Sequence, residues 1–455
     1  MNRGLQRSLA ALVVAAVIIG GWLGAPLLVA PTGAQPSAPI AGSVPAVPGR
    51  TPEPSIWPSP APSVIRYPGA TPGPPPIGGD PNPPGPVRHG IASATPLLRA
   101  ALDQRLEALR AKARIPGISA TILFPDGSVW HGSAGLADVA TGRRVSPDTV
   151  FPAASISKTF TAALILGLVE DGRIGLDKPV TSYLPTLAID RTITVRQLLD
   201  HRSGLSDFYF HKAIDKALLS QPARVWTAVR SLTYVGKPYF KPGTGWHYSN
   251  TNYLVLGLLA EAVGGEPVAR QLHARFLGPL SLDHTSYQSV EAPLGPVAHS
   301  YRFTGPSPKL RPIDLSDGTK VVPFTSVVTA AGAAGSIATT SDDLARWARA
   351  LYQGTALDLS SRVEMVADAL QVAPYHPAIS YGLGVQVVQV DGHLTLGHSG
   401  RFLGARGAVR WVPDPGISIA VLTNQSRSDP NLIVADLLRL ALQAQPDCVI
   451  CTVFP

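Results

Sequence analysis

The sequence predicts an α+β domain, with one antiparallel sheet built from both ends of the domain, flanking helices and an inserted, mainly helical subdomain. Patterns typical of β-strands occur at the start of the folded region, over residues 118–136. They return near its end, over residues 381–424. The interval between them has mostly the pattern of helices and long loops over residues 172–355. No internal repeat is visible in the chain.

The first predicted elements are a helix and a hairpin. Apolar residues recur at helical spacing from about Pro96 to Ala113, which predicts an amphipathic helix. Two β-patterned runs, 118–124 and 128–136, flank the turn residues Pro125-Asp126-Gly127 and predict an antiparallel hairpin.

The later elements follow from the same kind of pattern. The stretch from Ser155 to Val169 is apolar on nearly every side, so it predicts a buried helix. Gly, Pro or Asp bound the four strands expected near the end, which cover 381–390, 393–398, 405–412 and 416–424. A closing helix is predicted from about Asp429 to Ala444.

A chain of 455 residues is long for one compact domain, and its N-terminal part explains the excess. Residues 1–34 are predicted to be a targeting segment, because Arg3 and Arg7 precede an apolar stretch over residues 9–30. That stretch is long for a signal-peptide core and just enough to cross a bilayer, which takes about 20 residues. A cleaved signal peptide and an uncleaved membrane anchor both stay open, and either one exports the rest of the chain.

Residues 35–90 are predicted to be a Pro-rich, disordered stalk. Nineteen of the 45 prolines lie between Pro31 and Pro86, among many Gly, Ala and Ser residues. This composition has little with which to build a core and favours extended polyproline-type chain. The folded domain is then expected over residues 91–445.

The remaining residues, 446–455, are expected to be a tail that contains Cys448 and Cys451. Two cysteines are too few for a structural zinc site, which needs four ligands. In an oxidising compartment they either form a small disulfide or stay as free thiols.

Composition and missing motifs limit the partners. The net charge of +8 suits an anionic cell envelope, but no basic run or nucleic-acid motif is present, so no nucleic acid is expected. There is no H-E-x-x-H pair, and we expect neither a metal nor a cofactor.

The segment A-A-S-I-S-K-T-F (153–160) holds the first candidate for catalysis. If a helix starts near Ser155, Lys158 lies one turn further on the same face, whereas Ser157 points elsewhere. A serine hydroxyl is a poor nucleophile without a neighbouring base. A lysine becomes that base only if its pKa falls well below about 10.4. The apolar helix supplies burial, and its N-terminus favours an oxyanion beside Ser155. Alone, S-x-x-K is a weak signal, because a capping serine and a solvated lysine give the same letters.

Two further motifs strengthen the interpretation. Tyr248-Ser249-Asn250 lies 93 residues beyond Ser155, and His398-Ser399-Gly400 follows another 150 residues on, in the late strand region. In this order and at these intervals, the three motifs resemble the serine β-lactamase and penicillin-binding-protein family. The resemblance is closest to class C β-lactamases, D-alanyl-D-alanine carboxypeptidases and their esterase relatives. It covers about residues 95–443 and implies a β-lactamase/transpeptidase-like fold.

The resemblance implies a role for each matching residue. Ser155 would be acylated, and Lys158 would take or relay its proton. Tyr248 would pass a proton to the leaving group or take one from the deacylating water. Asn250 would orient Lys158 and the substrate amide.

The third motif would bind substrate. The backbone N–H groups of Ser155 and Arg401 would form the oxyanion hole, with Ser399 and Gly400 beside the substrate. Where β-lactamases usually have K-T-G, this chain has H-S-G followed by Arg401, which puts efficient β-lactam hydrolysis in doubt. If His398 is a cation that holds a substrate carboxylate, kcat/KM for an acidic substrate falls as pH rises through its pKa.

The sequence therefore predicts an exported serine acyl hydrolase of the bacterial cell envelope, with a small-molecule or peptidoglycan-peptide substrate of the D-Ala-D-Ala type. A β-lactamase or a short-chain esterase of the same fold is the alternative. A catalytically silent, penicillin-binding-like sensor or scaffold is the alternative of another class. The G-x-S-x-G motif of α/β-hydrolases is absent.

Overall fold

The computed structural model describes residues 93–304, 311–371, 379–390 and 392–443. The predicted targeting segment (1–34), the stalk (35–90) and the tail with Cys448 and Cys451 lie outside these residues. Within these ranges, no helix combines the length and the apolar character needed to cross a membrane.

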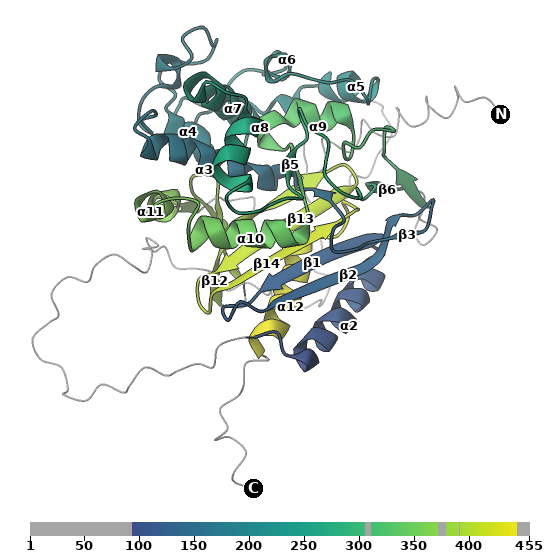
Figure 1. Ribbon diagram of the computed structural model, residues 1–455. Helices are drawn as coiled ribbons and strands as arrows, with labels where there is room; N and C mark the ends of the chain where they lie inside the picture. The colour runs from purple at the N-terminus through teal and green to yellow at the C-terminus, as the bar shows by residue number, and fades with distance from the viewer. Residues whose placement is uncertain (1–92, 305–310, 372–378, 391, 444–455) are drawn as a thin grey trace, which may run out of the picture.

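A nine-stranded antiparallel sheet forms the centre of the fold (Figure 1). Its order is β3-β2-β1-β14-β13-β12-β11-β10-β9, so strands from both ends of the domain meet where β1 pairs with β14. The predicted sheet built from both ends is confirmed. The bounds are β1 Gly117–Leu123, β2 Val129–Asp138, β3 Arg143–Arg144, β9 Leu370–Gln371, β10 Ile379–Tyr381, β11 Gln386–Val390, β12 His393–Phe402, β13 Ala405–Val412 and β14 Ile417–Thr423.

Helices cover both faces of this sheet. On one face lie α2 (Pro96–Ala113) and α12 (Pro430–Gln443), with α10 (Ser341–Tyr352) on the other. Alternate residues of β13 enter the two cores, as strand geometry requires. Ala408 and Val412 pack with α2 and α12, whereas Val409 packs with the core of the helical subdomain.

The helical subdomain lies between β4 (Phe151–Pro152) and β9 in the sequence, as expected. Small sheets accompany it: β4 pairs with β8 (Ile337–Thr339) and β8 with β5 (Ser286–Tyr287), while β6 (Tyr301–Thr304) pairs with β7 (Arg311–Asp314). Its other helices are α3 Ser157–Glu170, α4 Val195–Leu199, α5 Ile214–Leu219, α6 Ala228–Leu232, α7 Asn250–Gly264, α8 Val268–Leu272, α9 Thr325–Ala331 and α11 Leu359–Ala367. Short 3-10 or π turns are η1 Ala154–Ile156, η2 Val180–Ser182, η3 Phe208–Phe210, η4 His273–Leu277 and η5 Gly332–Ala334.

The predicted single strand over residues 381–390 is wrong. It is two strands, β10 and β11, separated by a bend with two tightly enclosed glycines. A Cβ on Gly382 would collide with the carbonyl oxygen of Met365. Gly384 has a φ of +74°, and a Cβ there would collide with Ala162 of α3. The bend brings the sheet edge onto the helical subdomain, and the strand pattern does not reveal that contact.

Candidate active site

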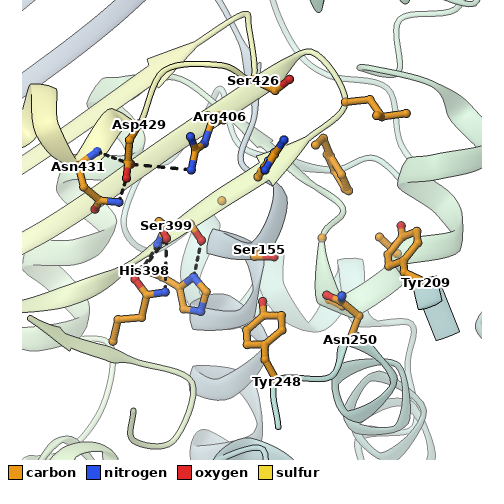
Figure 2. A pocket seen from close by; sticks show the side chains of 18 of the residues that line it. Ser155, Tyr209, Tyr248, Asn250, His398, Ser399, Arg406, Ser426, Asp429 and Asn431 are labelled. Carbon is orange, nitrogen blue, oxygen red and sulfur yellow. Dashed lines mark hydrogen bonds and ion pairs between the residues drawn. The ribbon is translucent and has the colours of Figure 1, made fainter. Parts of the chain in front are cut away.

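A cavity of about 380 Å³ lies where the helical subdomain meets β12, β13 and the start of α12 (Figure 2). Several elements contribute to its walls, among them η3, the loop before α7, α9 and η5. Ser155, Tyr248, Asn250 and His398 all line it, so three motifs that are far apart in sequence meet at one place.

The sequence analysis considered a helix that starts near Ser155. In the structure Ser155 lies in η1, a 3-10 turn directly before α3. Ala154 has a φ of +50°, a left-handed conformation that residues other than glycine rarely adopt. The N–H of Ala153 donates to the carbonyl oxygen of Ile337 at 2.8 Å, which fixes the turn. Ser157 points away from the cavity, as predicted, because its Oγ accepts from the N–H of Ile337 at 2.9 Å.

Lys158 is fully buried in the first turn of α3. Its Nζ lies 3.2 Å from Ser155 Oγ, 2.8 Å from Asn250 Oδ1 and 2.8 Å from the carbonyl oxygen of Ala334. The two carbonyl-type oxygens only accept hydrogen bonds. A neutral amine therefore donates to both oxygens and directs its lone pair at the hydroxyl of Ser155.

The protonation state of Lys158 suits this geometry. Burial lowers the pKa of Lys158 to about 7, against the opposing charge of Asp207. A large fraction of the amine is therefore neutral at neutral pH, as a general base requires.

Tyr248 approaches Ser155 from the loop before α7. A side-chain hydrogen bond links Tyr248 to Ser155, and Lys158 Nζ lies 4.9 Å from the centroid of the phenol ring. Burial raises the pKa of Tyr248 well above its usual value, although the bond to Ser155 opposes this rise. Ser155 thus lies beside a base, Lys158, and a phenol that keeps its proton.

The sequence analysis missed Asp207, whose carboxylate lies behind Asn250. Asn250 Nδ2 donates to Asp207 Oδ2 at 2.7 Å, and the backbone N–H of Asn250 donates to the same oxygen at 3.1 Å. Burial raises the pKa of Asp207, while these donors and Lys158 oppose the rise. The sequence gives only a weak signal for this contact, because Asp207 is a single aspartate that lies 43 residues before Asn250 and belongs to none of the three motifs.

His398 differs from the expected substrate-binding cation. Its Nδ1 lies 2.6 Å from the carbonyl oxygen of Ser399, which only accepts, so Nδ1 carries the proton. Its Nε2 accepts from the hydroxyl of Tyr381 at 3.0 Å. Tyr381 also lies 3.2 Å from Nε2 of His201, whose Nδ1 accepts from the N–H of Ser249.

Both ring nitrogens of His398 are therefore occupied within the protein. Burial lowers its pKa to about 3, helped by the charge of Lys158. These contacts favour a buried, neutral ring over the cation facing a substrate carboxylate that the sequence analysis considered for His398. Nδ1 of His201 also contacts Asn252 Nδ2, so His201 joins the loop before α7 to the first turn of that helix.

The rest of the third motif lies along the cavity. A Cβ on Gly400 would collide with the carbonyl oxygen of Ala153, so only glycine lets β12 approach the turn that carries Ser155. The next residue, Arg401, has an exposed side chain. The N–H of Ser399 donates to Gln386 Oε1 at 3.1 Å.

A buried cation, which the sequence analysis also missed, lies beyond Ser399. Arg410 is 2% exposed and donates from Nη2 to Gln386 Oε1 at 2.9 Å and to Asn431 Oδ1 at 2.8 Å. Its buried Nη1 has no hydrogen-bond partner among the described residues. Asn431 and Arg406 are drawn on the same side of Ser155 in Figure 2, with Tyr209 on the other.

Part of the cavity lining is apolar. These residues come from η3, α9, the end of β12 and the residue after it, and include Phe210, Val327, Phe402 and Leu403. One group of possible metal ligands occurs in the described ranges, made of Asp138, His299 and Asp314, and none of these lines the cavity.

Comparisons with known proteins agree with this geometry. Residues 102–444 match the Beta-lactamase family. The chain is 30% identical over 338 residues to Penicillin-binding protein 4 of Amycolatopsis lactamdurans, which covers 71% of this chain and 84% of that protein.

Two solved structures are similar over 76% of this chain. A D-stereospecific amidohydrolase from Streptomyces sp. has a TM-score of 0.64 and 30% identity, with 98% of that chain covered. A D-amino acid amidase from Ochrobactrum anthropi SV3, complexed with L-phenylalanine amide, has a TM-score of 0.65 and 25% identity, with 99% covered. These matches confirm the predicted β-lactamase/transpeptidase-like fold.

Proposed function

Since the chain belongs to the Beta-lactamase family of serine hydrolases, we propose that it is an exported serine acyl hydrolase that works through an acyl-enzyme on Ser155. One observation carries this proposal. A buried lysine amine lies 3.2 Å from the hydroxyl of a cavity serine, and its two other polar contacts are oxygens that only accept, so its neutral form directs its lone pair at that hydroxyl.

In acylation, Ser155 Oγ attacks the substrate carbonyl carbon, and its proton passes to Lys158. The oxyanion is stabilised by the backbone N–H groups of Ser155 and Arg401. Tyr248 gives its proton to the leaving group as the scissile bond breaks, and the proton held by Lys158 then passes to the Tyr248 oxygen and restores the phenol. In deacylation, water attacks the ester and its proton follows the reverse path, so the enzyme returns unchanged.

The proposed substrate is a D-Ala-D-Ala-type peptide or a related amide or ester. The names of the two similar structures support a D-configured amide substrate. Arg410 is the better candidate for holding a substrate carboxylate than His398, because it is a cation among the residues that line the cavity. It suits a substrate carboxylate, since charge-assisted hydrogen bonds to carboxylates are strong. Residues 1–34 direct the export of the chain, and the exported enzyme acts in the cell envelope.

A side-by-side assay of the purified full chain tests the proposed function. The substrates are an acylated D-Ala-D-Ala peptide, its L-Ala-L-Ala counterpart, a chromogenic cephalosporin and a short-chain nitrophenyl ester. We expect the D-peptide to be cleaved and its L-counterpart to be resistant. Fast cephalosporin hydrolysis would instead favour a β-lactamase, and ester cleavage alone an esterase. No turnover of any substrate would favour the silent scaffold.

Replacing Arg410 tests where the carboxylate binds. Arg410→Gln keeps a polar side chain but removes the charge, so kcat/KM for the D-peptide with a free C-terminus should fall by about tenfold or more. The same peptide with an amidated C-terminus should lose much less. Arg349→Gln is the matched control, because Arg349 also has a buried, unpartnered N–H group but lines another groove. Equal losses for the free and amidated peptides would rule out this role of Arg410.

A further inference from the structure

Asp207 has the contacts of an ionised carboxylate. It is 3% exposed and precedes η3, and its Oδ1 accepts from the N–H of Tyr209 at 3.0 Å. Its Oδ2 accepts two N–H groups of Asn250, at 3.1 Å and 2.7 Å. All three partners are donors, so the anion satisfies each of them, whereas a proton on Oδ1 or Oδ2 would compete with one.

We infer that Asp207 is a positioning residue for the base: it fixes the Asn250 amide so that its oxygen faces Lys158, and it keeps a negative charge behind the amine. This inference rests on the proposed function, because it assigns a role to Asp207 in activating Ser155. In the described part of the chain, Lys158 is the cation whose charge acts on Asp207.

The orientation of Asn250 follows from its two neighbours. Its Oδ1 accepts from Lys158 and its Nδ2 donates to Asp207. With the amide turned over, Oδ1 would face a carboxylate oxygen and the NH₂ group would face the amine. Without the Asp207 acceptor, the hydrogen bond from Lys158 alone would hold the oxygen of Asn250 in this orientation.

Four other titratable groups surround Lys158, and their pKa values keep them neutral, so Asp207 is the charged group near its amine. The rings of Tyr248 and Tyr253 face the amine, with centroids 4.9 Å and 5.4 Å from Nζ, and burial raises the pKa of both phenols well above the usual value. The charge of Lys158 acts on His201 and His398, and burial lowers the pKa of both imidazoles. At neutral pH these four groups are uncharged.

The negative charge of Asp207 decides in which direction the pKa of Lys158 moves when Asp207 is replaced. Lys158 accepts the proton of Ser155 only when its amine is neutral, so acylation speeds up as pH rises through its pKa. The anion of Asp207 favours the protonated amine, and removing it should lower that pKa. The rising limb of the pH profile should therefore move to lower pH. A purely structural role would lower the rate without moving the limb.

The test measures the rate of Ser155 labelling by a fluorophosphonate probe on the full chain, from about pH 5 to about pH 9. Asp207→Asn and Asp207→Ser both remove the charge, and serine also caps short helices well. Asp343→Asn is the matched control. Asp343 is likewise 3% exposed and accepts from an N–H and a hydroxyl, but it does not contact the cavity.

We expect the limb of either folded Asp207 variant to lie about one pH unit lower, because a nearby opposite charge shifts a pKa by about 1–3 units. The Asp343→Asn limb should coincide with that of the wild type. A limb that stays at the wild-type pH in the Asp207 variants, at whatever rate, overturns this inference alone. Absence of labelling at Ser155 in the wild type overturns the proposed function as well. If neither charge-free variant folds, Asp207 is structural and the inference fails.

Discussion

Ser155→Ala is expected to lower kcat/KM for the D-peptide by about 10³-fold or more, because loss of a catalytic nucleophile removes the whole covalent route. The cavity and the hydrogen bonds from Lys158 to Asn250 and Ala334 should persist, so substrate still binds. Steady-state kinetics together with substrate binding by calorimetry separates these two effects.

Ser157→Ala is the matched control for Ser155→Ala. Ser157 lies two residues away and accepts the N–H of Ile337 instead of facing the cavity. Its loss should lower the thermal midpoint, since a buried N–H group loses its partner at a cost of about 1–3 kcal/mol. Turnover should stay close to that of the wild type. If Ser157→Ala were the inactive variant and Ser155→Ala the active one, the assignment of the nucleophile would be wrong.

Lys158 and Tyr248 are expected to act as one proton-transfer unit. Lys158→Ala and Tyr248→Phe should each lower kcat/KM by at least about 10²-fold, the lower end for lost acid–base catalysis. The double variant should be far less than multiplicatively worse, because both residues serve the same proton of Ser155. The kcat/KM values of the wild type, the two single variants and the double variant give the coupling between Lys158 and Tyr248. Independent losses, about 10⁴-fold together, would count against a shared proton path.

The sequence predicted the parts of the site that local geometry decides. Ser155 and Lys158 are three residues apart, and their side chains meet even though Ser155 lies in η1 and α3 begins two residues later. The strand patterns likewise revealed the two ends of the sheet, because apolar runs bounded by Gly, Pro or Asp are a local signal.

Tertiary contacts decide the parts that the sequence did not predict. His398 has the residue type of a pH-dependent cation, but Tyr381 and the carbonyl oxygen of Ser399 occupy its ring nitrogens. Asp207 reaches Lys158 only through Asn250, and that contact depends on how η3 packs beside the start of α7. Arginine side chains are usually exposed, yet α12 buries Arg410 beside Asn431.

The most direct test of the central claim is to find the covalently modified residue. The full chain is incubated with a fluorophosphonate or penicillin probe, digested and analysed by mass spectrometry. We predict one added probe mass on the peptide that contains Ser155, with fragment ions that place it on Ser155 rather than on Ser157. Labelling that survives Ser155→Ala and maps to another serine would contradict the account.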